Sequence, residues 1–144
     1  MAFPYITQES RFDCGRACLR MIAKHFRKDY NSEYFTLLPF EQEASMLDLS
    51  NTAEKIGFET MCVKATLQKI IKKAPLPCIL HWNNNHFVVL YKIEQNSLKS
   101  KTVFSIADPA FGLFKLNEKE MIHHWYDSRP PKGGIALLFD TKTN

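Results

Sequence analysis

Cys14 is a candidate nucleophile because the sequence places it where a helix is expected to begin. From Cys14 onward, apolar residues recur on one helical face, while Arg16, Arg20 and Lys24 recur every four residues on the other. This pattern indicates an amphipathic helix over about 14–27, with the basic residues on a solvated face. The first turn of a helix gathers unpaired backbone N–H groups and the positive end of the helix dipole, which favour the nucleophilic thiolate. On this stretch alone, the alternative that Cys14 is a small buried apolar residue fits equally well.

A nucleophilic thiol needs a base, and the base needs a partner that orients it. His86 follows a run of three asparagines, where a strand is expected to leave a turn, and Asp108 ends the strand that comes next. If the two strands are antiparallel neighbours, the start of one lies beside the end of the other. Asp108 would then hold the tautomer of His86 and stabilise its imidazolium form. The pattern also allows a plainer interpretation, in which His86 is a surface turn residue and Asp108 starts a turn.

Gln8 is a candidate oxyanion-hole donor because it stands six positions before Cys14. Its side-chain amide carries two N–H donors. If the chain folds back over the helix start, that amide and the backbone N–H of Cys14 converge on one point beside the thiol. A glutamine before a helix is usually a surface residue, so this interpretation depends on Cys14 being the nucleophile.

The composition predicts an ordinary globular protein. Of its 144 residues, 45% are hydrophobic and 24% are charged, so we expect one domain, residues 1–144, with a single core. The net charge of +4 comes from scattered basic residues, which argues against a nucleic-acid partner. The four cysteines lack the spacing of a structural zinc site, and we expect no metal and no cofactor.

The apolar runs are too short to cross a membrane, and the first residues lack the pattern of a signal peptide. We therefore expect a chain that is not exported, whose cysteines are free thiols. The polar end, residues 140–144, suits a domain cut before a linker.

The order of elements predicts an α+β fold, with an N-terminal helical half of about 8–74 packed on a C-terminal antiparallel sheet half of about 75–140. Helix spacing and caps predict helices over 14–27, 33–38, 46–56, 67–73 and 121–126. Alternation and turn residues predict strands over 58–64, 78–82, 86–93, 102–107, 113–116 and 135–139, with an exposed polar loop over 94–101.

Three sequence motifs follow one another along the chain. The first is Gln8-x₅-Cys14, within Asp13–Cys14–Gly15-x-Ala17–Cys18–Leu19-x-Met21–Ile22. The second is Leu76–Pro77–Cys78–Ile79–Leu80–His81–Trp82, followed by Asn85–His86–Phe87–Val88–Val89–Leu90. The third is Ile106-x-Asp108–Pro109–Ala110-x-Gly112. Together the three motifs resemble those of the bacteriocin-processing, double-glycine leader peptidases. Their order and spacing make the resemblance specific, although each motif alone is weak.

The resemblance implies a papain-like cysteine peptidase fold, usually found as the N-terminal, cytosolic domain of an ABC exporter. Carried over by position, Cys14 is the nucleophile, His86 the base, Asp108 the orienting residue and Gln8 the oxyanion donor. His81 belongs to the histidine motif but has no catalytic role there.

The resemblance also implies the partners and the location. The substrate is a secreted precursor peptide with an amphipathic helical leader that ends in Gly-Gly, and cleavage follows the second glycine. The membrane and ATPase domains of the exporter lie outside this chain, which places it in the cytoplasm at the inner face of the bacterial membrane. A cleft too narrow for a Cβ would select the glycines, and Trp82 is the candidate substrate contact that narrows it.

Two departures from the family's pattern stand out. Arg16 replaces a small or apolar residue and is interpreted as a change on the solvent face, whereas Glu43–Ala44–Ser45–Met46 replaces an expected Gly-Thr/Ser feature near substrate. Two other functions stay open: a leader-binding module that has lost catalysis, and another Cys-His-Asp acyl-transfer enzyme of the transglutaminase or amidase type.

Overall fold

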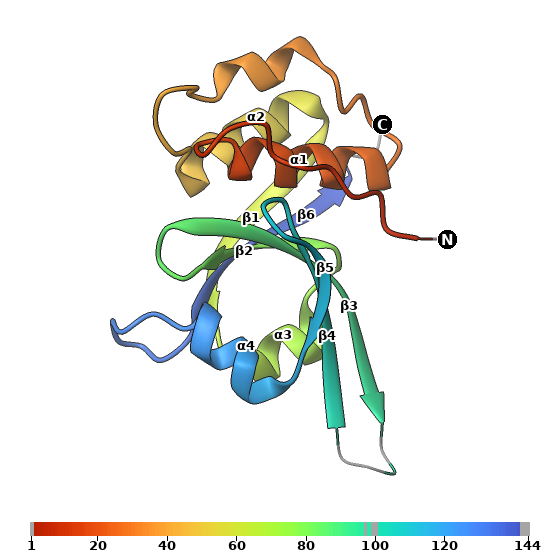
Figure 1. The fold of residues 1–144 in the computed structure, drawn as a ribbon, viewed down its shortest axis with the longest axis vertical. Coiled ribbons are helices and arrows are strands. Elements are labelled where there is room, and N and C mark those ends of the chain that lie inside the picture. The colour runs from red at the N-terminus through yellow and green to blue at the C-terminus, as the bar shows by residue number, and fades with distance from the viewer. Residues whose placement is uncertain (1, 97, 99–100, 142–144) are drawn as a thin grey trace.

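The computed structural model describes residues 2–96, 98 and 101–141, and its elements surround a six-stranded antiparallel sheet (Figure 1). The helices are α1 (Cys14–His25), the 3₁₀ helix η1 (Glu33–Leu37), α2 (Met46–Ile56), α3 (Leu67–Lys73) and α4 (Glu118–Trp125). The strands are β1 (Phe58–Ala65), β2 (Cys78–Trp82), β3 (His86–Asn96), β4 (Lys101–Asp108), β5 (Gly112–Leu116) and β6 (Gly134–Thr141), in the sheet order β1-β6-β2-β3-β4-β5.

The predicted α+β fold is confirmed, and α2 shows how local sequence sets its boundaries. Ser45 Oγ accepts a hydrogen bond from the Asp48 amide at 3.0 Å, and Asp48 Oδ2 accepts one from the Ser45 amide at 2.8 Å. The short aspartate side chain therefore completes a full capping box. At the other end, Gly57 takes a left-handed φ of 118°, which glycine adopts without steric penalty and which stops the helix.

Other boundaries differ from the sequence-based prediction. Helix α1 ends at His25, two residues earlier than expected, and Arg27 just beyond it takes a positive φ of 59°. The segment expected as a helix over 33–38 is the 3₁₀ helix η1, with Ser32 as its cap. The strands of the β3–β4 hairpin extend into the predicted polar loop, reaching Asn96 and starting again at Lys101. Residues 97 and 99–100 of that loop, and 142–144 of the polar end, lie outside the described residues.

Two apolar clusters lie on opposite faces of the sheet. The first packs α1, η1 and α2 against one face, and the second packs α3 and α4 against the other (Figure 1). Leu19, Ile22 and Leu49 are fully buried in the first cluster. Burial of each such side chain stabilises the fold by roughly 1.5–3 kcal/mol, so the first cluster fixes the start of α1 over the sheet.

Strand β1 joins the two halves of the chain into one sheet. It comes from the N-terminal half, yet it pairs with β6 over its whole length, from Phe58 opposite Thr141 to Ala65 opposite Gly134. In the described part of the chain, no helix combines the length and the apolar character needed to cross a membrane.

Candidate active site

Cys14 is the first residue of α1, where the helix lies close to α2 and β3. Its side chain is 2% exposed and belongs to the first apolar cluster. A Cβ at the next residue, Gly15, would lie 3.1 Å from Leu49 and 3.4 Å from Phe87. Gly15 therefore lets the first turn of α1 approach both α2 and β3. The thiol stands where backbone N–H groups of the first turn have no partner within the helix.

His86 and Asp108 meet at one edge of the sheet because β3 begins where β4 ends. The pairing of Val89 with Ala107 fixes that register. His86 Nε2 and Asp108 Oδ1 are 2.7 Å apart, and Asp108 is 3% exposed. The same carboxylate oxygen accepts a hydrogen bond from the Ala110 amide at 2.9 Å, so the turn after β4 holds the carboxylate in place.

The imidazole of His86 also interacts with the Cys14 side chain. Burial alone would lower the pKa of His86, but the hydrogen bonds to Asp108 and Cys14, together with their charges, raise it to about 9. Because Nε2 is occupied by Asp108, Nδ1 is the ring nitrogen left for the thiol. The three side chains thus form a thiol–imidazole–carboxylate series in one place, which is the arrangement that activates a nucleophilic cysteine.

Cys18 lies one helical turn after Cys14 and has a different environment. It is fully buried, and its thiol donates to the carbonyl of Phe87 at 3.3 Å. Burial raises the pKa of Cys18 well above its ordinary value, and the nearby charges of Cys14 and Asp108 add to this effect. Cys18 therefore stays a neutral thiol, and all four cysteines are free.

The segment before α1 passes along the turn that follows Asp108. Tyr5 Oη donates to the Asp108 carbonyl at 2.6 Å, and the Gln8 amide donates to the Pro109 carbonyl at 2.9 Å. These bonds place Gln8 beside the carboxylate end of the site. Its side-chain Nε2 donates to the Ser10 carbonyl at 3.0 Å, while its Oε1 is buried and has no hydrogen-bond partner among the described residues.

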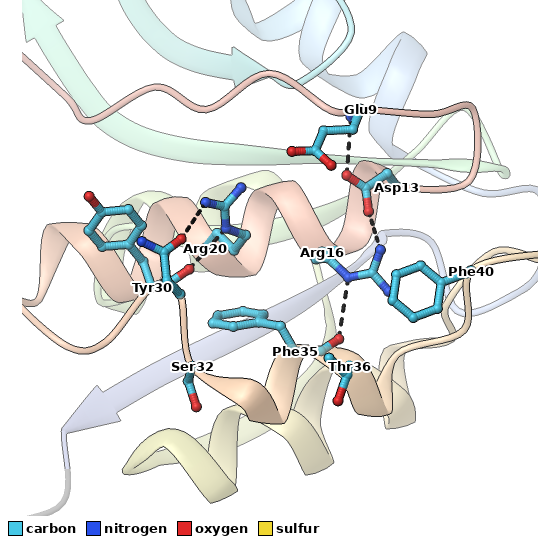
Figure 2. A pocket seen from close by; sticks show the side chains of 10 residues that line it. Glu9, Asp13, Arg16, Arg20, Tyr30, Ser32, Phe35, Thr36 and Phe40 are labelled. Atoms are coloured by element: carbon cyan, nitrogen blue, oxygen red, sulfur yellow. Dashed lines mark hydrogen bonds and ion pairs between the residues drawn. The ribbon is translucent and has the colours of Figure 1, made fainter.

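The interpretation of Arg16 as a solvent-face residue is wrong. Its side chain is 15% exposed and pairs with Asp13, which is itself 5% exposed. The guanidinium also donates to the Phe35 carbonyl at 3.3 Å and the Leu38 carbonyl at 2.9 Å, and it lies 3.9 Å from the ring centre of Phe40 (Figure 2). Asp13, Arg16, Phe35 and Phe40 are among the residues that line a pocket of about 290 Å³ beside α1 (Figure 2).

Sequence reasoning missed the roles of Asp13 and Arg16 in this contact network. Helical periodicity places Arg16 opposite the apolar face, as observed, but the carbonyls that it binds lie 19 and 22 positions away. Only the three-residue spacing of an acidic and a basic side chain pointed to the Asp13–Arg16 pair.

Trp82 and His81 lie on opposite faces of β2. Trp82 is 3% exposed, belongs to the second apolar cluster and stacks on His124, with ring centres 5.3 Å apart. Cys14 belongs to the first cluster, so this packing does not place the Trp82 ring beside the thiol. His81 is half-buried with its ring 5.3 Å from that of Phe87, a residue of the first cluster, and burial lowers its pKa. A substrate contact by Trp82 stays a prediction.

Within the described ranges, no group of three or more His, Cys, Asp or Glu side chains could hold a metal ion.

The chain is similar in sequence to known peptidases and to bacterial export proteins. Residues 2–129 match the Peptidase C39 family. The colicin V secretion/processing ATP-binding protein CvaB of Escherichia coli is 32% identical over 126 residues, which cover 85% of this chain and 17% of that protein. The lactococcin-G-processing and transport ATP-binding protein LagD of Lactococcus lactis subsp. lactis is 32% identical over 129 residues, covering 83% of this chain and 17% of that protein.

Two solved structures share the fold. A double glycine motif protease from an AMS/PCAT transporter, crystallised with its leader peptide, superposes with a TM-score of 0.80 at 27% identity and covers 96% of this chain and 91% of that one. The peptidase domain of Streptococcus ComA gives a TM-score of 0.79 at 22% identity, covering 98% of this chain and 100% of that one.

The fold and the family match define a cysteine peptidase domain of the papain-like type. The chain belongs to the Peptidase C39 family. It spans less than a fifth of the length of the curated relatives cited above.

Proposed function

We propose that this chain removes the leader from secreted precursor peptides by cleaving after a Gly-Gly motif. The observation that carries the proposal is the contact of one imidazole, His86, with both Cys14 and Asp108. The similarity to a leader-bound double glycine motif protease supports the substrate class.

In the proposed mechanism, the Cys14 thiolate attacks the carbonyl carbon of the second glycine. The C=O electron pair moves to oxygen, and the tetrahedral intermediate collapses as His86 gives its proton to the leaving amine. A water molecule, deprotonated by His86, then attacks the thioester and releases the leader acid and the Cys14 thiol. Asp108 keeps the ring orientation and stabilises the imidazolium in both steps.

Gln8 and the backbone N–H of Cys14 are the proposed oxyanion donors. The buried Oε1 of Gln8 has no hydrogen-bond partner among the described residues. A half-turn about the Cγ–Cδ bond would place the NH₂ group there instead, at the loss of the bond from Nε2 to the Ser10 carbonyl. Negative charge on the substrate oxygen favours that orientation, because the NH₂ group can then donate a charge-assisted hydrogen bond to the oxyanion.

The leader is proposed to bind an exposed apolar surface next to α1. Tyr34, Leu37 and Phe40, from η1 and the segment after it, are 40%, 61% and 61% exposed, and Leu47 in the first turn of α2 is 68% exposed. An amphipathic helix that ends in the scissile glycines would place its apolar face on these side chains. We refer to these four residues as the leader surface.

The proposed setting is an exporter of the kind that the relatives' names describe. The membrane and ATPase domains of such a protein lie outside this chain, and cleavage takes place in the cytoplasm at the inner face of the membrane. The leader peptide is then the direct partner of this domain, and no nucleic acid takes part.

A synthetic leader peptide followed by Gly-Gly and a short cargo sequence tests the proposal. Mass spectrometry should find a single cut after the second glycine, and replacing either glycine by alanine should abolish it. Peptide that binds tightly but stays intact would indicate a binding module. Hydrolysis of small amides without any effect of the leader would indicate another acyl-transfer enzyme.

A further inference from the structure

We propose that Asp13 and Arg16 act as a positioning pair that holds the Gln8 segment at the thiol end of α1. This inference rests on the proposed function, because it concerns the donor that would stabilise the oxyanion. Neither residue is assigned contact with the substrate; both act through the placement of Gln8.

Asp13 stands at the N-cap position of α1, yet its carboxylate makes no capping bond to the helix. Its Oδ2 accepts instead from the backbone amide of Glu9 at 3.1 Å, and its Oδ1 pairs with Arg16. A residue of this type at this position normally satisfies an amide of its own helix. The Asp13 carboxylate therefore holds Glu9, the residue that follows Gln8, instead of capping its own helix.

Arg16 keeps that carboxylate from moving. Its planar guanidinium donates to Asp13 on one side and to the carbonyls of Phe35 and Leu38 on the other, with the Phe40 ring stacked against it. A guanidinium held by several partners in one plane has little freedom to reorient. A buried carboxylate without a cation would be unstable, so removing Arg16 should release Asp13 as well.

Gln8 is thereby held from both sides. Its own amide bonds to Pro109 in the turn that carries Asp108, and the next amide, that of Glu9, bonds to Asp13 at the start of α1. The Gln8 backbone thus runs between the turn that follows β4 and the start of α1. A displacement of about 1 Å in such a group can reduce turnover about 10²-fold.

Arg20 offers a matched control. It lies one turn further along α1, donates to the Tyr30 carbonyl at 2.9 Å and to Asn31, and lies over the Tyr30 ring. It therefore anchors a neighbouring loop in the same manner, but it makes no contact with Asp13.

The first measurement is hydrogen exchange of the Glu9 amide by NMR in the whole chain. We expect Arg16→Ala and Asp13→Ala to speed that exchange at least about 10-fold relative to wild type, and Arg20→Ala to leave it unchanged. Arg16→Lys keeps the positive charge but loses the planar guanidinium with its several donors, so it should give an intermediate exchange rate. This variant replaces Arg16→Ala in the test if Arg16→Ala does not fold. Unchanged Glu9 exchange in Arg16→Ala, or the same increase in Arg20→Ala, would overturn the proposal.

The second measurement is a double-mutant cycle on kcat for the leader peptide. If Arg16 acts through Gln8, Arg16→Ala should lower kcat about 10–100-fold in the wild-type background and have almost no effect in a Gln8→Ala background. Fully additive losses would contradict the pair's role. A wild-type chain that never cuts the leader would overturn the proposed function, whereas the exchange result would still decide whether the pair holds the segment.

Discussion

His86 Nε2 and Asp108 Oδ1 lie 2.7 Å apart, although 22 positions separate the two residues in the chain. The contact follows from one hairpin, whose two strands start and end at the same edge of the sheet. Because regular strands position sites more accurately than free loops, the orientation of the imidazole is a property of the sheet itself. The Ala110 amide, in the turn after β4, donates to the same carboxylate oxygen and helps to hold it in place.

Replacing Asp108 should lower the pKa of His86. Burial lowers this pKa, but the hydrogen bond of Asp108 is the largest influence that raises it to about 9, and the Cys14 side chain and the charge of Asp108 add to that rise. In Asp108→Asn, an NMR titration of the ring should find the pKa of His86 much closer to its ordinary value of 6.5. Leader cleavage should fall roughly 10²–10⁴-fold. A pKa that stays near 9 in this variant would show that Asp108 does not control the ring.

The raised pKa also predicts a pH-dependent contribution to stability. A histidine that binds its proton more tightly in the folded state stabilises the fold fully below its unfolded pKa. That contribution is lost as pH rises from about 6.5 to about 9, the two values that apply to His86. Urea unfolding of wild type and His86→Gln should therefore give a difference in free energy that shrinks across this range.

His81→Gln provides the control for that measurement, because the pKa of His81 shifts in the opposite direction to that of His86. Burial lowers the pKa of His81 in the folded chain, so the stability of wild type relative to this variant should rise with pH until the unfolded histidine has lost its proton. The same trend in both variants would contradict the assignment of the effect to the His86 environment.

Removing the Gln8 amide should slow turnover without weakening leader binding. A missing oxyanion donor typically costs about 10²–10³ in kcat, because the charge it stabilises exists only in the transition state. Steady-state kinetics of Gln8→Ala should show this loss with little change in KM. Gln95→Ala, an exposed glutamine on β3, should behave as wild type. An unchanged kcat for Gln8→Ala would remove Gln8 from the mechanism.

The leader surface should affect KM and leave kcat unchanged. Leu37 and Leu47 are 61% and 68% exposed, and covering such a side chain contributes roughly 1.5–3 kcal/mol. Leu37→Ser and Leu47→Ser should each raise KM for the leader peptide about 10-fold. Leu98→Ser, between β3 and β4 with 96% exposure, is the matched control. Equal effects at all three positions would place the leader elsewhere.

Local features of the sequence predicted much of the fold. The caps of α2 and the bounds of β2 follow from Ser45, Gly57 and the apolar run over 78–82, because these signals act over a few neighbouring residues. The three asparagines predicted a tight turn, and Asn83 and Asn84 do take positive φ values of 51° and 65°. The meeting of His86 and Asp108 could be inferred for the same reason, since a single hairpin determines it.

Features set by distant partners could not be predicted in this way. The burial of Arg16 depends on carbonyls of η1 and the segment after it, and nothing near Arg16 in the sequence encodes their position. The face on which Trp82 packs depends on how the sheet is covered by α4, where His124 meets its ring. The pairing of β1 with β6 joins residues from 69 (134 − 65) to 83 (141 − 58) positions apart, so the sequence indicated only that each segment is a strand.

The central claim is that the thiol of Cys14 performs the cleavage. Cys14→Ala should cut a Gly-Gly leader peptide at no detectable rate while binding the leader with the wild-type Kd, and Cys62→Ala, at an exposed cysteine on β1, should cut normally. Peptide cleavage by Cys14→Ala at a rate near that of wild type would contradict the account.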